Sequence, residues 1–186
     1  MKKIYTIISL AFASLLMITT TAFMDKNGSQ VKNSTDEMLA NWERAKAYTK
    51  EYLDAATEKT INYKPTPEMR SFAEQLLHLT QGNINIVSSA TGKTRIYDGV
   101  QLEKLDEYKS KEALTKVVME GYDYVIAAIK EVPADKWNDQ VTIFRFEMSR
   151  EEGVEKAFEH QTHHRGQTTV YLRLSGVTPP NEKLFE

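Results

Sequence analysis

Four helix-length segments, each with apolar residues at three- and four-residue steps, constrain the fold of this chain most strongly. In the first segment the apolar stripe consists of Met38, Trp42, Ala45, Tyr52 and Ala56. This spacing is typical of a helix that packs one face against a core. The predicted helices cover residues 34–59, 67–89, 110–131 and 149–175. The sequence therefore predicts an all-α fold, a four-helix bundle with long connections between helices two and three and between helices three and four.

Signals for helix starts support these bounds. Residues 34–37 and 149–152 are capping boxes, in which a serine is followed three places later by a glutamate. Thr66 can cap the second helix with Pro67 in its first turn, where a missing N–H costs nothing. Ser110 can cap the third. Between the third and fourth helices, residues 141–144 can form a short extended piece.

The N-terminal segment has the pattern of a bacterial secretory signal peptide. Two lysines precede an uncharged, mostly apolar run, and small residues stand at the −3 and −1 positions of a cleavage site after Ala22. We expect residues 1–22 to be this signal peptide, 23–33 a flexible leader and 34–186 the bundle. The protein would then be exported, either periplasmic or secreted. An uncleaved N-terminal anchor is the alternative, and it is the one case in which we expect membrane association.

Composition narrows the possible chemistry. The net charge of −2 offers no basic field for a nucleic acid. The chain has no cysteine, which rules out thiolate ligands and a cysteine nucleophile. Any metal ion must therefore be held by nitrogen or oxygen.

The stretch HQTHHRGQ, residues 160–167, concentrates the candidate site residues. His160 and His164 lie on one helical face, because residues four apart are neighbours on a helix, and His163 falls at the rim of that face. Two imidazoles at this spacing can bind one ion. Gln161 replaces the glutamate of the zincin signature, so a zincin-type protease is rejected. A surface pair or a hydrogen-bonded core pair remains an alternative to a metal site.

The fourth histidine, His78, is ambiguous from periodicity alone. It lies opposite the apolar arc of the second helix, where it could be a solvated surface residue or line a polar cleft. Neither it nor the other histidines has the Glu-x-x-His spacing of di-iron bundles.

Two stretches resemble the DinB-like family of metal-binding four-helix proteins. They are YKPTPEMRSFAEQLLHL (63–79) and MSREEGVEKAFEHQTHHRGQTTVYLRLSGVTPP (148–180). The resemblance implies an up-down-down-up bundle whose metal ligands are His78, His160 and His164. Characterised relatives include metal-dependent transferases that use small thiols, and a thiol-dependent isomerase.

A three-histidine site leaves coordination positions open, which is typical of catalytic rather than structural sites. The donor set fits zinc, nickel or iron(II) without choosing among them. Glu74, Gln75, Gln167 and Tyr171 are candidates for orienting the ligands; the catalytic residues stay unidentified. The expected function is that of an exported metal-dependent hydrolase or thiol-type transferase of a small-molecule substrate, with a homodimer as the expected assembly. The alternative is a non-catalytic metal-binding or partner-binding bundle.

Overall fold

The computed structural model describes residues 26–185, with side chains from Thr35 onward. The predicted signal peptide, residues 1–22, lies outside this range. The chain divides into two units after Ser34, and the features below belong to the unit that begins at Thr35.

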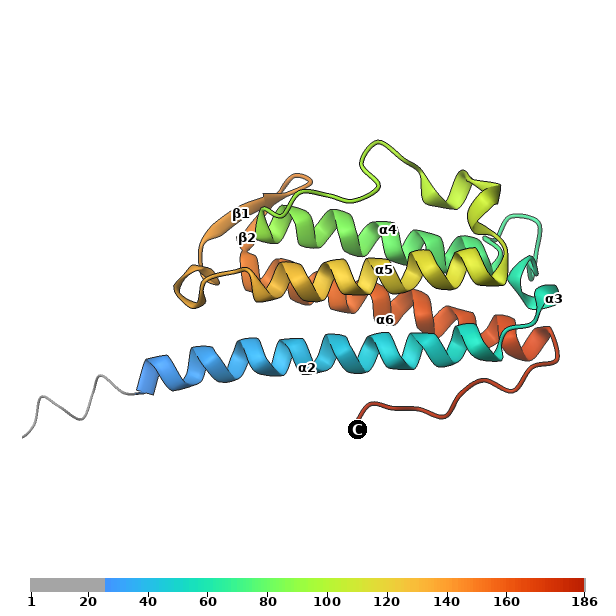
Figure 1. Ribbon diagram of the computed structural model, residues 1–186, viewed down its shortest axis with the longest axis horizontal. Coiled ribbons are helices and arrows are strands. Elements are labelled where there is room, and N and C mark those ends of the chain that lie inside the picture. Colours follow the sequence, from blue (N-terminus) through green and yellow to red (C-terminus); the bar gives the residue numbers. More distant parts are fainter. Residues whose placement is uncertain (1–25, 186) are drawn as a thin grey trace, which may run out of the picture. The chain divides into compact units, whose positions relative to one another are not determined.

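The predicted four-helix bundle is confirmed. Its helices are α2 (Lys26–Ala55), α4 (Phe72–Thr91), α5 (Lys111–Lys130) and α6 (Arg150–Leu174). Figure 1 shows α4 and α5 running in the same direction, opposite to α6 and to the part of α2 that follows Ser34. The topology is up-down-down-up, and the long connection from α4 to α5 is needed because two parallel neighbours cannot be joined by a tight turn.

Short elements fill the connections. A single turn, α3 (Glu58–Ile61), follows α2, and two 3₁₀ turns, η1 (Leu102–Lys104) and η2 (Asp106–Tyr108), lie between α4 and α5. After the 3₁₀ turn η3 (Ala134–Lys136), strands β1 (Gln140–Ile143) and β2 (Phe146–Ser149) form an antiparallel hairpin that leads into α6. The extended piece predicted at 141–144 is part of this hairpin.

Two predicted helix starts are wrong. Helix α4 begins at Phe72 rather than Pro67, because Ser71 and Glu74 form a capping box: the Ser71 hydroxyl accepts from the Glu74 N–H, and the Glu74 carboxylate accepts from the Ser71 N–H. Helix α2 begins at Lys26, so the predicted cap at Ser34 lies within the helix. A serine that can cap does not end a helix whose preceding residues also adopt helical angles. The caps predicted for α5 and α6, Ser110 and Ser149, are confirmed.

Helix α4 packs against both α5 and α6. Its apolar residues are almost all buried, but so are four of its polar side chains: Gln75, Thr80, Asn83 and Ser88. Burying polar groups costs free energy unless they find partners. Gln75 and Asn83 find theirs among side chains of α6, whereas the Thr80 hydroxyl donates to the Leu76 carbonyl of its own helix. Among the described residues, no helix is both long and apolar enough to cross a bilayer.

Candidate metal centre

Three histidines meet between α4 and α6. His78 comes from α4, and His160 and His164 come from successive turns of α6. One ring nitrogen from each lies within 4.8 Å of the others. The ring centroids are 4.5 Å apart for His160 and His164, 4.6 Å for His78 and His164, and 5.5 Å for His78 and His160. The two helices thus bring three nitrogen donors to one point, and we call these residues the histidine cluster.

A glycine makes room for the cluster. Gly82 lies one turn beyond His78 on α4, and a Cβ atom at this position would lie 2.2 Å from Cε1 and 2.7 Å from Nε2 of His160. Real Cβ atoms do not approach other atoms so closely. The absence of a side chain at Gly82 therefore allows the imidazole of His160 to lie against the backbone of α4.

Gln75 sets the proton position on His164. Its amide nitrogen donates to Gln167 Oε1 and, at 3.3 Å, to the Tyr171 hydroxyl. Its amide oxygen therefore faces His164, and Nδ1–H of His164 donates to it at 2.9 Å. The lone pair of His164 is then on Nε2, the nitrogen left for an ion.

The other two rings have oxygen-bearing neighbours of their own. His78 Nδ1 lies 3.8 Å from Oε2 of Glu103, which comes from η1. His160 Nδ1 lies 3.2 Å from Asn83 Oδ1. The reversed Asn83 amide would instead donate to His160 Nδ1 and to the backbone carbonyls of Leu79 and Ala157. Asn83 can therefore satisfy either tautomer of His160, including the one that leaves Nε2 free to bind an ion.

The site holds its imidazoles neutral. Burial, followed by the neighbouring imidazoles and Arg70, lowers the pKa of His160 to about 4 and that of His164 to about 3. Burial and Arg70 also lower the pKa of His78, against the opposing effect of Glu103. Neutral imidazole is the form that binds metal. Among the described residues this is the one group of three side chains with metal-ligand geometry, and its three nitrogen donors fit a divalent ion of the zinc, nickel or iron(II) type.

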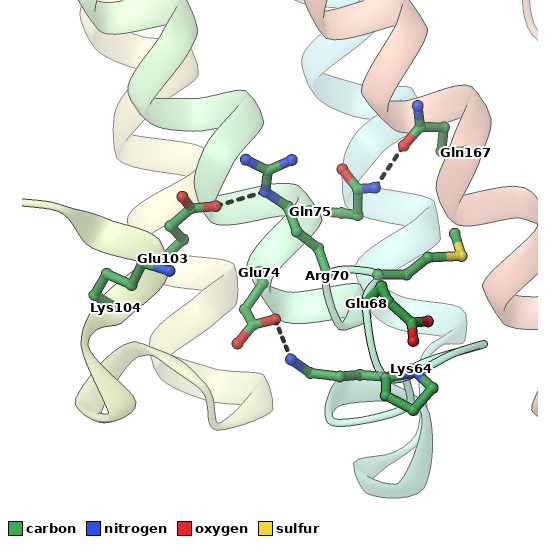
Figure 2. Close-up of a pocket in the computed structure, with 10 residues that line it drawn as sticks. Lys64, Glu68, Arg70, Glu74, Gln75, Glu103, Lys104 and Gln167 are labelled. Carbon is green, nitrogen blue, oxygen red and sulfur yellow. Dashed lines mark hydrogen bonds and ion pairs between the residues drawn. The ribbon is translucent and has the colours of Figure 1, made fainter.

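A polar cleft of about 520 Å³ lies beside the histidine cluster. Its wall includes Gln75 and Gln167, which form the hydrogen-bonded chain to His164, and Glu103, which lies near His78. Figure 2 shows the Arg70 side chain between Glu103 and Gln75. The remaining lining residues are Lys64, Pro67, Glu68, Met69, Glu74 and Lys104. A small molecule in this cleft would lie within reach of the groups that orient the histidines.

The model of the DinB family matches residues 29–185. The chain belongs to the DinB family. It is 23% identical over 150 residues to YrdA, an uncharacterized protein of Bacillus subtilis strain 168, covering 78% of this chain and 85% of the relative. Two crystal structures share the fold. One is a DinB-like protein of Bacillus cereus ATCC 10987, with TM-score 0.69, 21% identity and coverage of 80% of this chain and 97% of the other. The other is the DinB-like protein YjoA of Bacillus subtilis, with TM-score 0.63, 15% identity and coverage of 81% and 99%.

The DinB fold brings together most of the residues predicted for the site. All three histidines are in the cluster, Gln75 contacts His164, and Gln167 and Tyr171 contact Gln75. Glu74 is the exception. Its carboxylate accepts from the Ser71 N–H and pairs with Lys64 at 2.9 Å and Lys109 at 3.4 Å, so it stabilises the start of α4 instead of orienting a histidine.

Four residues of this DinB site were not predicted: Arg70, Gly82, Asn83 and Glu103. Gly82 follows His78 by four positions and so shares its helical face, where the polar side of the predicted helix contained a signal for it. Asn83, one position further, lies on a different face and had no such signal. Glu103 has no such signal, because it belongs to a connection with no periodic pattern. Arg70 lies within the helix predicted over 67–89, but the structure places it before the Ser71 cap, so helical spacing from His78 does not apply to it.

Proposed function

We propose that this DinB-family protein binds one divalent metal ion through His78, His160 and His164 and acts on a small molecule in the adjoining cleft. The reaction classes that fit are hydrolysis and thiol-type group transfer. The observation that supports this proposal is the convergence of three neutral imidazoles, from two helices, next to a polar cleft whose wall includes Gln75 and Glu103, the neighbours of His164 and His78. A purely structural zinc site usually has four protein ligands and no access for a ligand from outside.

A bound divalent ion would supply Lewis acidity toward an oxygen or sulfur atom of a ligand in the cleft. The protein's own residues hold and orient the donors. Gln75 keeps the Nε2 lone pair of His164 exposed, and Glu103 provides a carboxylate beside Nδ1 of His78. No carboxylate is among the three donors, so the charge of the ion would remain uncompensated by its ligands, which favours anionic ligands.

Export and dimer formation are further parts of the proposal. The lysine-led apolar segment before residue 23 supports secretion into the periplasm or the medium. A homodimer is the assembly that we expect. Both are testable on the expressed full chain, by N-terminal sequencing of the recovered protein and by light scattering.

A second candidate is non-catalytic metal binding. Glu103, the carboxylate nearest to His78, forms an ion pair with Arg70 at 2.6 Å. It is therefore a poor candidate for a free general base, and this engagement favours a metal carrier or buffer.

Metal content tests the common part of both candidates. The full chain, purified without chelators, is expected to hold about one divalent ion, as measured by elemental analysis. His160→Ala should abolish retention through gel filtration. The matched variant His163→Ala should keep it, because His163 is exposed and is not one of the three converging donors, although its ring lies 4.9 Å from that of His164. Equal metal content in all three proteins would refute the site.

Activity then separates the candidates. Metal-loaded and metal-depleted protein should be compared on a panel of small esters, amides and thiol conjugates. Turnover that needs the ion and is lost in His164→Ala supports an enzyme. Tight, reversible ion uptake without turnover on any substrate favours the carrier.

A further inference from the structure

Arg70 has donors that the fold does not use. It precedes the Ser71 cap of α4, and its side chain extends along the cleft wall between Glu103 and Gln75 (Figure 2). In the described part of the chain its one hydrogen bond runs from Nε to Glu103 Oε2, at 2.6 Å. The two terminal NH₂ groups of the guanidinium are left for a ligand.

The position of Arg70 also links the cleft to the histidine cluster. Its ion-pair partner Glu103 lies 3.8 Å from His78 Nδ1. Gln75, on the other side of the Arg70 side chain in the cleft wall, accepts from Nδ1–H of His164. A group bound by Arg70 would therefore be held next to the ion site.

We propose that Arg70 is a substrate-binding residue that selects small molecules with an anionic oxygen group, such as a carboxylate, while the reacting end of the molecule faces the histidine cluster. This assignment rests on the proposed function, because it concerns the same cleft. The guanidinium suits a carboxylate because its planar donors match the two oxygens of that group.

The other cations of the cleft are less suited to this role. Lys64 is paired with Glu74 at 2.9 Å. Lys104 is exposed and lies beside Glu103 in the chain. The pairing of Arg70 with Glu103 does not cancel its capacity, since the carboxylate engages Nε and leaves the terminal groups unbonded. Glu103 instead holds the guanidinium in place before a ligand arrives. The cleft, about 520 Å³, is of a size that accommodates a small molecule.

The test uses two probes that differ in one charge. The full chain is loaded with Co²⁺, whose thiolate complexes have a near-ultraviolet charge-transfer band. It is then titrated with 3-mercaptopropionate and with the neutral 3-mercaptopropionamide. The thiolate of either probe reports contact with the ion, and only the acid can form a charge-assisted pair with Arg70 through two oxygens. We expect the acid to bind about tenfold more tightly than the amide, as a charge-assisted hydrogen-bonded pair warrants.

Variants assign the preference to Arg70. Arg70→Gln should reduce the acid-to-amide ratio to about one while keeping the Co²⁺ content of the wild type. Lys104→Gln removes the same charge from the same cleft and should leave the ratio near its wild-type value. Glu103→Gln removes the competing negative charge but keeps an oxygen that can accept from Nε, so the ratio should stay the same or rise.

The outcomes separate the two proposals. Failure to take up Co²⁺ refutes the proposed metal function. Uptake of Co²⁺ without a thiolate band from either probe refutes the placement of the reacting end at the histidine cluster, and with it the role of Arg70. A thiolate band with equal affinity for the two probes, or a preference for the acid that survives Arg70→Gln because the carboxylate chelates the ion, refutes the role of Arg70 alone. If Arg70→Gln does not fold, Arg70→Lys decides: it retains the charge but loses the planar fork, and the ratio should fall severalfold without reaching one.

Discussion

Helix α6 has a polar cluster on each of two faces, and the two clusters differ in how completely the protein satisfies them. Facing α4 are His160 and His164 of the histidine cluster. Facing α2 and α5 is a second group, which we call the arginine cluster. Its members are Thr49, Tyr122, Gln161 and Arg165.

The arginine cluster is closed. Arg165 is 4% exposed, and its Nη1 donates to Gln161 Oε1 at 3.0 Å and to the Ala45 carbonyl at 3.4 Å. The Tyr122 hydroxyl donates to Gln161 Oε1 at 3.0 Å and lies 2.7 Å from the Thr49 hydroxyl. The Arg165 guanidinium also stacks over the Tyr48 ring, 4.5 Å from its centroid. Each of these contacts is made to another protein group.

The histidine cluster is satisfied on one side and open on the other. One ring nitrogen of each histidine lies within 4.8 Å of the other two, and for His164 the bond to Gln75 leaves Nε2 as an acceptor. In the tautomers that direct all three lone pairs to that point, the rings would need a cation or a donor from outside the chain. The comparison teaches that polar side chains bonded to one another serve the fold, whereas ring nitrogens that converge on one point form a place for a ligand.

The largest effect is expected from removing the guanidinium of the arginine cluster. Arg165→Ala should destabilise the protein by about 3 kcal/mol, because it leaves a cavity and removes the charged group that donates to Gln161 Oε1 and to the Ala45 carbonyl. For a domain of this size that is a fall in Tm of roughly 6–12 °C. Thermal unfolding followed by circular dichroism measures it. Arg173→Ala, an exposed arginine on the same helix, is the control and should lie within about 0.5 kcal/mol of the wild type. Equal melting of the two variants would contradict the assignment.

The second effect comes from filling the space beside His160 in the histidine cluster. Gly82→Ala places a methyl group 2.2 Å from Cε1 of His160, so the ring must move away from the other two. Metal affinity should fall about 10- to 100-fold, a size typical of disturbed ligand orientation. Competition with a chelator of known affinity measures it. Gly166→Ala is the matched control on α6: nothing lies within 4 Å of its Cβ, so affinity should stay constant and stability should rise by about 0.5–1 kcal/mol.

The third effect concerns Glu74, which the sequence does not distinguish from its neighbour Gln75 as a candidate for orienting a histidine. Burial alone would raise the pKa of Glu74, but the Ser71 N–H, Lys64 and Lys109 outweigh it and lower the pKa to about 2. A carboxylate with a lowered folded-state pKa stabilises the protein above its ordinary pKa, and this contribution is lost as the pH falls toward 2.

Glu74→Gln should therefore cost on the order of 2 kcal/mol at pH 7. The difference from the wild type should stay constant down to about pH 5 and then shrink as the wild-type carboxylate protonates. Urea unfolding at several pH values tests this. Glu37→Gln, at an exposed site on α2, should show no such dependence. A difference that persists unchanged at pH 3 would rule out the charged cap.

Helical spacing in the sequence predicted two members of the histidine cluster but not the third. The pair on α6 followed from helical spacing, since His160 and His164 are four residues apart. Helical spacing did not place His78. A row of polar residues has the same period whether it faces water or another helix. Helix α4 buries several polar side chains because it packs against both α5 and α6. The family resemblance supplied the ligand set that periodicity left open.

The fold was predictable where local signals were unambiguous. Ser110 and Ser149 cap their helices as predicted. The start of α4 was not, because Thr66-Pro67 and Ser71-x-x-Glu74 are both valid start signals and the structure uses the second. The positions of Glu103 and of the arginine cluster depend on contacts between residues far apart in the chain, such as Tyr122 with Gln161. No local sequence pattern predicts these contacts.

The smallest effect concerns Gln75, the neighbour of Glu74. Its substitution should weaken metal binding, whereas that of Glu74 should lower stability. Gln75→Ala removes the acceptor of His164 Nδ1–H, which fixes the tautomer that exposes Nε2. Metal affinity should fall about tenfold, the lower end of the range for such partners, because the imidazole keeps its position between α4 and α6. Gln167→Ala should have a smaller effect, since Gln167 contacts Gln75 and not a clustered histidine. Chelator competition on both variants and on Glu74→Gln completes the test.

One outcome would contradict the assignment: Glu74→Gln weakens metal binding as much as Gln75→Ala does. The distinction between a residue that caps the helix and one that orients a ligand would then not hold. The histidine cluster and the arginine cluster would differ less than their hydrogen bonds indicate.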